Sequence, residues 1–158
     1  MPTRIPMKLE KIAIGRDEQS WLNRALSGFK FFGGLTVKEL DNVMACVDLF
    51  HYPASTAVFC EGRPGDSMFV IYQGRVAVRK NKFFILSREV ARLGPGEIFG
   101  EMALLHAAPR NATLKTLEDS KLFVLLAEDF RMLLDKSPDM ARRMRHLADG
   151  RAWIERQR

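Results

Sequence analysis

The feature that most constrains the fold is a series of short β-rich runs in the middle of the chain. The helical period disappears between residues 48 and 126, where Val, Ile, Phe, Tyr and Thr gather in short stretches. These stretches are residues 57–60, 68–72, 75–78, 83–86, 113–115 and 121–125. Turn sequences rich in Gly, Pro and Asp separate them, as at residues 61–66 and 93–96. Six to eight short strands in so short a segment predict a barrel, sandwich or jelly roll.

Helical patterns flank this segment on its N-terminal side. Apolar residues from Trp21 to Phe29 recur at helical spacing until Gly33 and Gly34 break the run. Thr36 and Glu39 have the spacing of a capping box and predict the start of a second short helix. Residues 1–47 are therefore expected to form a tail and a small helical bundle.

The last third of the chain also returns to a helical pattern. Residues 128–136 predict one short helix, and Ser137 precedes a second that has Pro138 at its favourable first position. We expect residues 48–126 to form the β-roll and residues 127–158 to form two C-terminal helices. A chain of 158 residues suits a single domain built from all three parts.

Composition excludes several classes of protein. The longest apolar runs are far too short to cross a bilayer, and the charged N-terminus lacks the apolar stretch of a secretory signal. Cys46 and Cys60 form neither a disulfide framework nor a CxxC motif, so we expect a cytoplasmic protein. The net charge of +6 suits anionic partners such as nucleic acid, acidic lipid or a small phosphate, and composition does not choose among them.

One segment, residues 99–113, carries residues with a distinctive chemistry. Gly100 allows a close backbone approach, and the residues after it suit a single helical turn whose first N–H groups favour an anion. Nine residues after Glu101 comes Arg110, whose guanidinium can bind phosphate in bidentate fashion. Spacing alone leaves two interpretations open: a site for a phosphate and a neighbouring hydroxyl, or a surface Glu–Arg pair beside a turn.

The same segment resembles the phosphate-binding cassette of the cyclic nucleotide-binding domain family, whose pattern is close to F-G-E-x-A-L-x(4)-P-R-x-A. The matching residues are Phe99, Gly100, Glu101, Ala103, Leu104, Pro109, Arg110 and Ala112. Upstream, residues 61–66 and 68–74 are similar to the glycine framework of the family's β-roll. The resemblance runs from roughly Leu26 to Leu147 and implies an eight-stranded β-roll, mainly β with flanking helices.

The resemblance also implies a role for each cassette residue. Glu101 would accept a hydrogen bond from the ribose 2′-hydroxyl. Arg110 would pair with the cyclic phosphate, together with backbone N–H groups around Gly100, Ala103 and Ala112. Both charged side chains are present, so we expect a working pocket for cAMP or cGMP.

Two further parts of the ligand are assigned by the same resemblance. Family members with Thr or Ser directly after the cassette arginine favour cGMP, and those with Ala favour cAMP; Asn111 matches neither, and we expect cAMP. A residue of the last helix usually covers the base. Arg145 and Leu147 are the candidates, with Trp153 further along, and each has an ordinary alternative as a solvated charge, a core residue or a tail contact.

Catalysis and metal binding find no support in the sequence. His51, His106 and His146 are far apart and lack the His-x-His pattern of a metal-dependent jelly roll, so we expect neither an enzyme nor a metal site. Nucleic-acid binding is the main alternative, because the terminal helix is rich in arginine. The chain stops at Arg158, before a helix-turn-helix domain, so we do not expect direct DNA regulation.

The expected function is a cyclic nucleotide sensor that closes its last helix over the ligand. It would act on an effector protein or on a further domain of a longer parent. The alternative is a basic nucleic-acid-binding or partner-binding module on a β-roll that no longer binds cyclic nucleotide.

Overall fold

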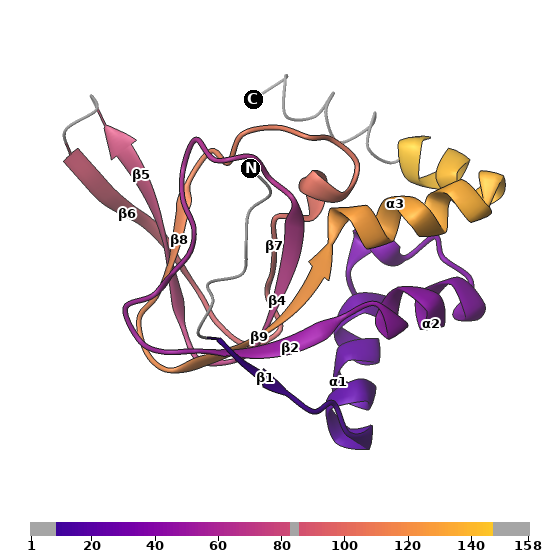
Figure 1. Ribbon diagram of the computed structural model, residues 1–158, viewed down its shortest axis with the longest axis horizontal. Coiled ribbons are helices and arrows are strands. Elements are labelled where there is room, and N and C mark those ends of the chain that lie inside the picture. Colours follow the sequence, from indigo (N-terminus) through magenta and orange to yellow (C-terminus); the bar gives the residue numbers. More distant parts are fainter. Residues whose placement is uncertain (1–8, 83–85, 147–158) are drawn as a thin grey trace.

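Two antiparallel sheets form the centre of the computed structural model, which describes residues 9–82 and 86–146. The larger sheet has the strand order β1-β2-β9-β4-β7 and the smaller one β3-β8-β5-β6 (Figure 1). The strands are β1 (Glu10–Ile12), β2 (Asp48–Tyr52), β3 (Ala57–Phe59), β4 (Ser67–Gln73), β5 (Val76–Lys82), β6 (Leu86–Leu93), β7 (Ile98–Phe99), β8 (Thr113–Thr116) and β9 (Ser120–Leu126). Strands β2 to β9 make up the expected eight-stranded β-roll, which confirms the fold class.

The space between the sheets is filled by alternate side chains of their strands. Ile71 of β4, Leu114 of β8 and Leu122 of β9 are completely buried in this cluster. β9 is the central strand of the larger sheet, and its side chains alternate between this cluster and the core under the helices, where Phe123 lies. A strand covered on both faces reads as a continuous apolar run, and the run at residues 121–125 predicts a strand for that reason.

Two strands have no clear signal in the sequence. β1 extends the larger sheet by pairing with β2, although its Glu and Lys residues show no strand pattern. β6 follows the run expected at residues 83–86, and residues 83–85 lie outside the described part of the chain. Most of β6 is exposed because it lies at the edge of the smaller sheet, next to β5. An edge strand does not need the apolar alternation by which strands are recognised.

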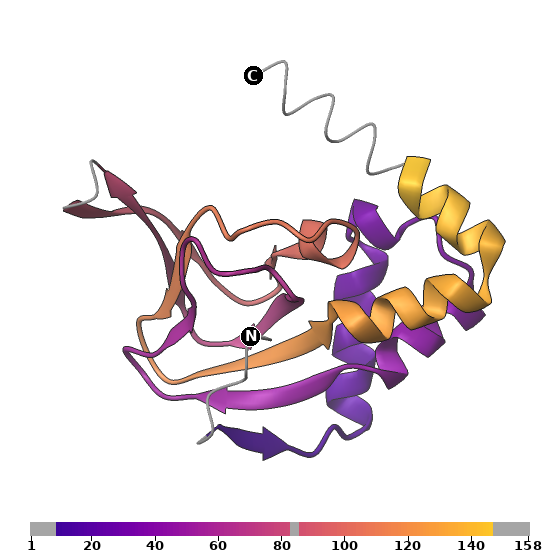
Figure 2. The same cartoon turned by 45° about the horizontal axis from the view of Figure 1, so that its top comes forward.

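Helices cover one end of the roll and share a second apolar core with the larger sheet (Figure 2). They are α1 (Arg16–Ser27), the 3-10 helix η1 (Lys30–Phe32), α2 (Val37–Ala45), α3 (Ala127–Lys136) and a helix over residues 138–146. Three buried aromatic rings, those of Phe31, Phe32 and Phe130, meet between η1 and α3. The N-terminal and C-terminal helices therefore form one layer, although about a hundred residues separate them in sequence.

An ion pair joins the last described helix to α2. Thr36 and Glu39 form the predicted capping box, with Glu39 N–H donating to Thr36 Oγ1 at 3.2 Å and Thr36 N–H donating to Glu39 Oε1 at 2.9 Å. The same carboxylate accepts two hydrogen bonds from Nη2 of Arg143, at 2.7 and 2.8 Å, and Arg143 Nη1 also donates to the carbonyl of Gly34. Partial burial raises the pKa of Glu39, but the hydrogen bonds from Thr36 and Arg143 outweigh it, and the pKa lies below its ordinary value.

Two further observations concern residues 9–82 and 86–146. No helix within them is both long and apolar enough to cross a bilayer. Within the same residues, no three potential metal ligands among His, Cys, Asp and Glu come together.

Candidate functional site

The cassette begins with a sharp turn between β7 and a short 3-10 helix. β7 ends at Phe99, which pairs with Phe69 of β4, and Gly100 then adopts a left-handed conformation with φ of 82°. The 3-10 helix η2 spans Glu101–Leu104 and is anchored by Leu104, which is completely buried. The structure thus confirms the single helical turn expected here.

Backbone hydrogen bonds bring the two sequence motifs together. The N–H of Arg110 donates to the carbonyl of Arg63 at 2.7 Å, and the carbonyl of Arg110 accepts from Gly62 N–H at 2.8 Å. An isolated bridge between Pro64 and Pro109 continues this contact. The turn at residues 61–66 is therefore a wall of the cassette, although more than forty residues separate it in sequence from the residues it contacts.

The guanidinium of Arg110 lies in a nearly dry environment. Only 8% of the residue is exposed, and its Cζ lies 4.2 Å from the centre of the Phe59 ring and 5.9 Å from that of Phe69. Nη2 donates to the Ser67 carbonyl at 2.8 Å and to the Ser67 hydroxyl at 3.2 Å. Burial lowers the pKa of Arg110, and the carboxylate of Asp66, 3.9 Å away, opposes this in part. An arginine remains charged in proteins, so this site buries a cation.

One donor of this buried cation has no partner in the described part of the chain. Nε of Arg110 is inaccessible to solvent and makes no hydrogen bond to residues 9–82 or 86–146. A buried donor left unpaired costs roughly 1–3 kcal/mol, and more when the group is charged. An anion in the adjoining pocket would offset this charge, and a small shift of the side chain would let Nε donate to it. The geometry therefore favours an anionic ligand over the interpretation as a surface Glu–Arg pair.

Two glycines allow this close packing. A Cβ on Gly100 would lie 2.8 Å from Arg110 Nη1 and 3.0 Å from the carbonyl oxygen of Ser67. A Cβ on Gly65 would lie 3.1 Å from the carbonyl oxygen of Ala108 and 3.2 Å from Cβ of Ala103. A side chain at either position would push on the guanidinium or on the loop that carries it.

A pocket of about 520 Å³ opens beside Arg110. Gly100, Glu101, Ala103, Arg110 and Asn111 all line it, so the structure brings together most of the residues that the sequence pointed to. Ala112, which is 1% exposed, packs in the core just behind the wall. The volume lies in the range of small-molecule sites, which is about 300–1,000 Å³. The pocket combines a buried cation, a carboxylate and an amide, the groups needed to hold a phosphate, a hydroxyl and a base.

Comparison with known proteins decides the family. A family model described as "Cyclic nucleotide-binding domain" matches residues 49–137, more than half of the chain. The chain belongs to the cyclic nucleotide-binding domain family. The match covers the roll, the cassette and α3, and it confirms the resemblance found in the sequence.

Curated relatives of this cyclic nucleotide-binding domain are regulators and channels. A cyclic AMP receptor protein of Thermus thermophilus is 32% identical over 116 residues, which cover 73% of this chain and 54% of that protein. A cyclic nucleotide-gated potassium channel of Mesorhizobium japonicum is 38% identical over 96 residues, covering 61% and 25%. A cAMP-dependent protein kinase regulatory subunit of Aspergillus niger is 31% identical over 105 residues, covering 66% and 25%. The chain thus spans about half, or less, of the length of these relatives.

Solved structures agree with the fold. A cyclic nucleotide-binding domain from Methylobacillus flagellatus superimposes with a TM-score of 0.76, covering 97% of this chain and 88% of that one, at 22% identity. The regulatory domain of Toxoplasma gondii protein kinase A, crystallised with cAMP, gives a TM-score of 0.70 at 29% identity, covering 75% and 45%.

The base-covering candidates of this cyclic nucleotide-binding domain lie apart from the cassette or outside the described residues. Arg145 is exposed, and its Nε donates to the Ala141 carbonyl at 3.4 Å. It lines a second pocket of about 360 Å³ between η2, α3 and the last described helix. Leu147 and Trp153 lie outside the described residues. Arg145 is therefore not on the wall of the cassette pocket in this structure.

The sequence motif assigned no role to three residues of the domain's site. Phe59 forms the floor under the guanidinium, and Ser67 binds it from β4. Both come from β-rich segments in which a core role is the simpler interpretation. His106 lines both the cassette pocket and the second pocket. Its place inside the cassette, between the helical turn and Pro109, is the signal that could have found it.

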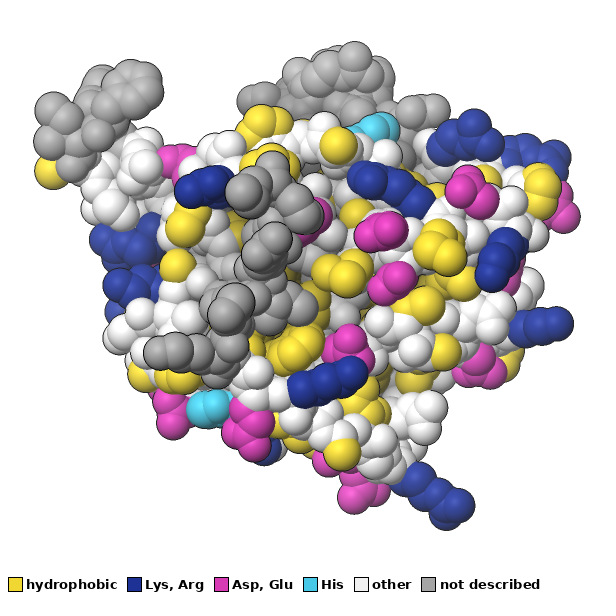
Figure 3. Space-filling view, viewed as in Figure 1, with side chains coloured by type: hydrophobic (Ala, Val, Ile, Leu, Met, Phe, Trp, Pro, Cys, Tyr) yellow, Lys and Arg dark blue, Asp and Glu magenta, His cyan; other side chains and the backbone are white. Residues whose placement is uncertain are grey.

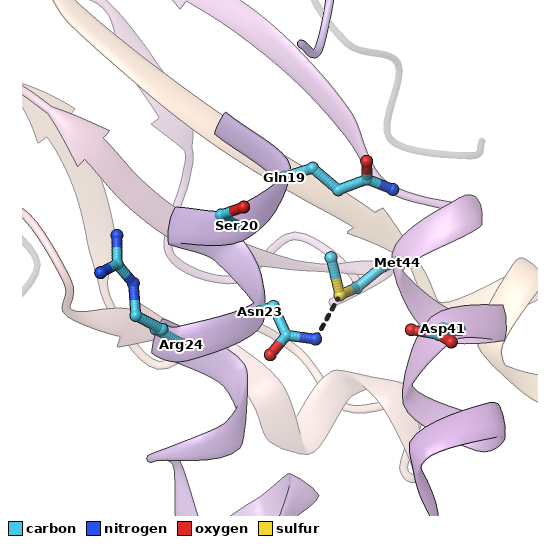
Figure 4. Close-up of a pocket in the computed structure, with 6 residues that line it drawn as sticks. All are labelled: Gln19, Ser20, Asn23, Arg24, Asp41 and Met44. Carbon is cyan, nitrogen blue, oxygen red and sulfur yellow. Dashed lines mark hydrogen bonds between the residues drawn. The ribbon is translucent and has the colours of Figure 1, made fainter. Parts of the chain in front are cut away.

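A third pocket lies away from the cassette, between α1 and α2 (Figure 4). It is about 490 Å³ in volume and is lined by Gln19, Ser20, Asn23, Arg24, Asp41 and Met44. The amide of Asn23 donates to the sulfur of Met44 at 3.5 Å, which joins the two helices. One cation and one anion line it, so its charge favours no ionic ligand.

Proposed function

We propose that this domain binds a cyclic purine monophosphate, cAMP in preference to cGMP, and works as a sensor module. The observation that carries the proposal is the buried guanidinium of Arg110 at the wall of the cassette pocket, whose Nε has no acceptor among the described residues. Relatives named for cyclic AMP or cyclic nucleotides support the choice of ligand. The cAMP that was crystallised with the Toxoplasma gondii regulatory domain supports the adenine base.

Each cassette residue has a proposed role in holding the ligand. The Arg110 guanidinium binds the cyclic phosphate, and Glu101 accepts a hydrogen bond from the ribose 2′-hydroxyl. Backbone N–H groups around Gly100, Ala103 and Ala112 complete the phosphate site; in this structure the N–H of Ala103 donates to the Gly100 carbonyl at 3.1 Å. That bond closes η2, so phosphate binding at Ala103 requires η2 to adjust.

Asn111 is proposed to face the base. The residue is exposed on the pocket wall and follows the phosphate-binding arginine in sequence. An amide both donates and accepts, and this chemistry alone fits either purine, so the preference for cAMP rests on the relatives named above.

Closure of the C-terminal helix over the base is proposed as the response to the ligand. η2 contributes to the walls of both the cassette pocket and the pocket that contains Arg145, and His106 lines both. A shift of η2 on phosphate binding would therefore change the surface that faces α3 and the last helix. Arg145 and Leu147 are the proposed base-covering residues. Closure requires that they contact the ligand more strongly in the closed state than in the open one.

The organisation and output of the protein belong to the same proposal. Residues 1–47 form the N-terminal part, residues 48–126 the roll with the cassette at 99–113, and residues 127–158 the hinge and lid helices. The output passes to an effector protein or to a further domain of a longer parent chain, in the cytoplasm, without catalysis and without direct DNA binding. The relatives matched are named as receptors, channels and kinase regulatory subunits, which supports a regulatory role.

Calorimetric titration of nucleotide-stripped protein with cAMP and with cGMP tests the proposal. We expect one-to-one binding that is tighter for cAMP. Arg110→Ala removes at least two charge-assisted hydrogen bonds, each worth about 1.5–3 kcal/mol, and should weaken binding by at least about a hundredfold.

Arg142→Ala is the matched control for that variant. Its exposed side chain pairs with the nearby Asp139, so the variant loses the same charge away from the pocket and should bind as the wild type does. No heat with either nucleotide would overturn the proposal and leave the alternative, a basic module that binds nucleic acid or a protein partner.

A further inference from the structure

The positive charge of this protein is concentrated in one hairpin. Residues 75–93, which contain β5 and β6, hold six Lys and Arg residues against one Glu. The excess of five in this segment compares with an excess of six for the whole chain. Figures 1 and 2 show the hairpin projecting beyond the rest of the roll, at the end opposite the helices. In Figure 3, dark blue side chains gather on the flank below it.

The strand register places two of these cations directly opposite each other. Lys80 of β5 is the cross-strand partner of Arg88 of β6, so their side chains lie on the same face of the hairpin. Like charges in this position repel each other and destabilise a hairpin. An anion bound between them would attract both cations and offset their mutual repulsion.

Two neighbouring cations of the hairpin are held by residues of β6, unlike this pair. Arg92 forms a two-point ion pair with Glu89, at 2.7 and 3.4 Å, and Arg79 donates to the hydroxyl and the carbonyl of Ser87. Neither Lys80 nor Arg88 forms an ion pair with any residue within 9–82 and 86–146. Their charges therefore remain available to an external partner.

An exposed apolar side chain lies next to this cationic pair. Leu86 is 64% exposed and stands two residues before Arg88, on the same face of the strand. Val90, at the bulge of β6, is 46% exposed.

We propose that the end of the β5–β6 hairpin, through Lys80, Arg88 and Leu86, docks on a membrane surface that contains anionic phospholipid. The two cations bind headgroup phosphates, and Leu86 enters the interface between headgroups and acyl chains. This combination fits a lipid surface better than a nucleic acid, because a sugar–phosphate backbone offers no apolar medium for an aliphatic side chain. The surface is separate from the cassette, so docking does not depend on the nucleotide proposal.

Co-sedimentation of the full chain with lipid vesicles tests this inference. We expect binding to vesicles of phosphatidylcholine mixed with phosphatidylserine, and little binding to phosphatidylcholine alone. Each cation near an anionic membrane changes binding about fivefold, so the double variant Lys80→Ser with Arg88→Ser should bind about 25-fold more weakly. Leu86→Ser should weaken binding about fivefold through lost apolar burial.

The matched control is Lys30→Ser with Lys38→Ser. It removes the same charge from two exposed positions in the helical layer, at the other end of the molecule. This control should keep binding within about threefold of the wild type, because long-range attraction between exposed charges is screened by salt. Circular dichroism establishes that every variant is folded.

Three outcomes would overturn the inference. One is the absence of binding that depends on phosphatidylserine, and another is an equal loss in the hairpin variant and the control. The third comes from fluorescence anisotropy with a labelled oligonucleotide. If Lys80 and Arg88 are needed for oligonucleotide binding, while Leu86→Ser is neutral and vesicles do not bind, the hairpin is a nucleic-acid surface.

Discussion

Replacing Gly100 by alanine has two expected effects, backbone strain and a collision of the new methyl group with its neighbours, and a control variant separates them. Gly100 has a φ of 82°, where a side chain is strained whatever the surrounding space. The position that a Cβ would take is also crowded, with Arg110 Nη1 at 2.8 Å and the Ser67 carbonyl oxygen at 3.0 Å. Gly96, in the turn before β7, has a similar φ of 89°, but a Cβ there would have nothing within 4 Å. Gly96→Ala is therefore a control that keeps the strain and removes the collision.

The strain of a left-handed alanine should lower the free energy of unfolding by a similar amount in the two variants. The left-handed conformation costs a non-glycine residue roughly 1–2 kcal/mol. Gly100→Ala must in addition move the guanidinium of Arg110 or the strand that carries Ser67. Displacing the guanidinium to clear the methyl group weakens a charge-assisted hydrogen bond, whose complete loss would cost about 1.5–3 kcal/mol. We therefore expect nucleotide affinity to fall by about tenfold, and by no more than about 150-fold.

Chemical denaturation measures the first effect, and calorimetric titration with cAMP measures the second. Both variants should unfold at lower urea concentration than the wild type. Only Gly100→Ala should bind cAMP weakly, with Gly96→Ala close to the wild type. Equal affinity in the two variants would refute the reasoning, because the contact between Gly100 and Arg110 would then have no part in holding the ligand.

Three further predictions concern the rest of the fold. Glu39→Gln removes the ion pair with Arg143 and should lower the free energy of unfolding by about 1 kcal/mol near neutral pH. The folded-state pKa of Glu39 is lowered, so this contribution is fully present above the unfolded pKa of about 4.3. It is lost as pH falls through the folded pKa. The free energies of unfolding of variant and wild type, measured in urea, should therefore converge in acid. Phe130→Ala should cost about 3–5 kcal/mol in the same assay, since the ring is completely buried, and a loss below about 1 kcal/mol would contradict that burial. Burial raises the pKa of Tyr52 well above its ordinary value. In a Tyr72→Phe variant, which leaves Tyr52 as the single tyrosine, the absorbance of tyrosinate should appear only as the protein unfolds in alkali. A reversible titration near pH 10 would be inconsistent with the structure.

Much of the fold could be predicted because its signals are local. The capping box of Thr36 and Glu39 lies within four residues, and both of its hydrogen bonds are present. The apolar runs of β4 and β9 reflect burial in the middle of a sheet. β6 gave no such signal, because a strand at a sheet edge is held by backbone hydrogen bonds on one side and can carry polar residues.

The cassette pocket contains both residues that the sequence motif predicts and residues that it does not. Its motif includes Gly100, Glu101 and Arg110, which line one pocket together with the adjacent Asn111. The motif does not contain Phe59 or Ser67, which hold the guanidinium from other strands. The family resemblance suggested a base-covering role for Arg145, which lines a different pocket in this structure.

The sequence by itself determined the family, the helices and most of the strands, and the residues of the cassette motif, because each depends on neighbours along the chain. Only the tertiary structure decided that Arg110 is buried on Phe59, with Nε unpaired among the described residues, and that Lys80 faces Arg88. It also decided that Arg143 reaches back more than a hundred residues to Glu39. Such contacts arise when distant segments pack together, and packing depends on the register and burial of whole elements, which no local pattern records.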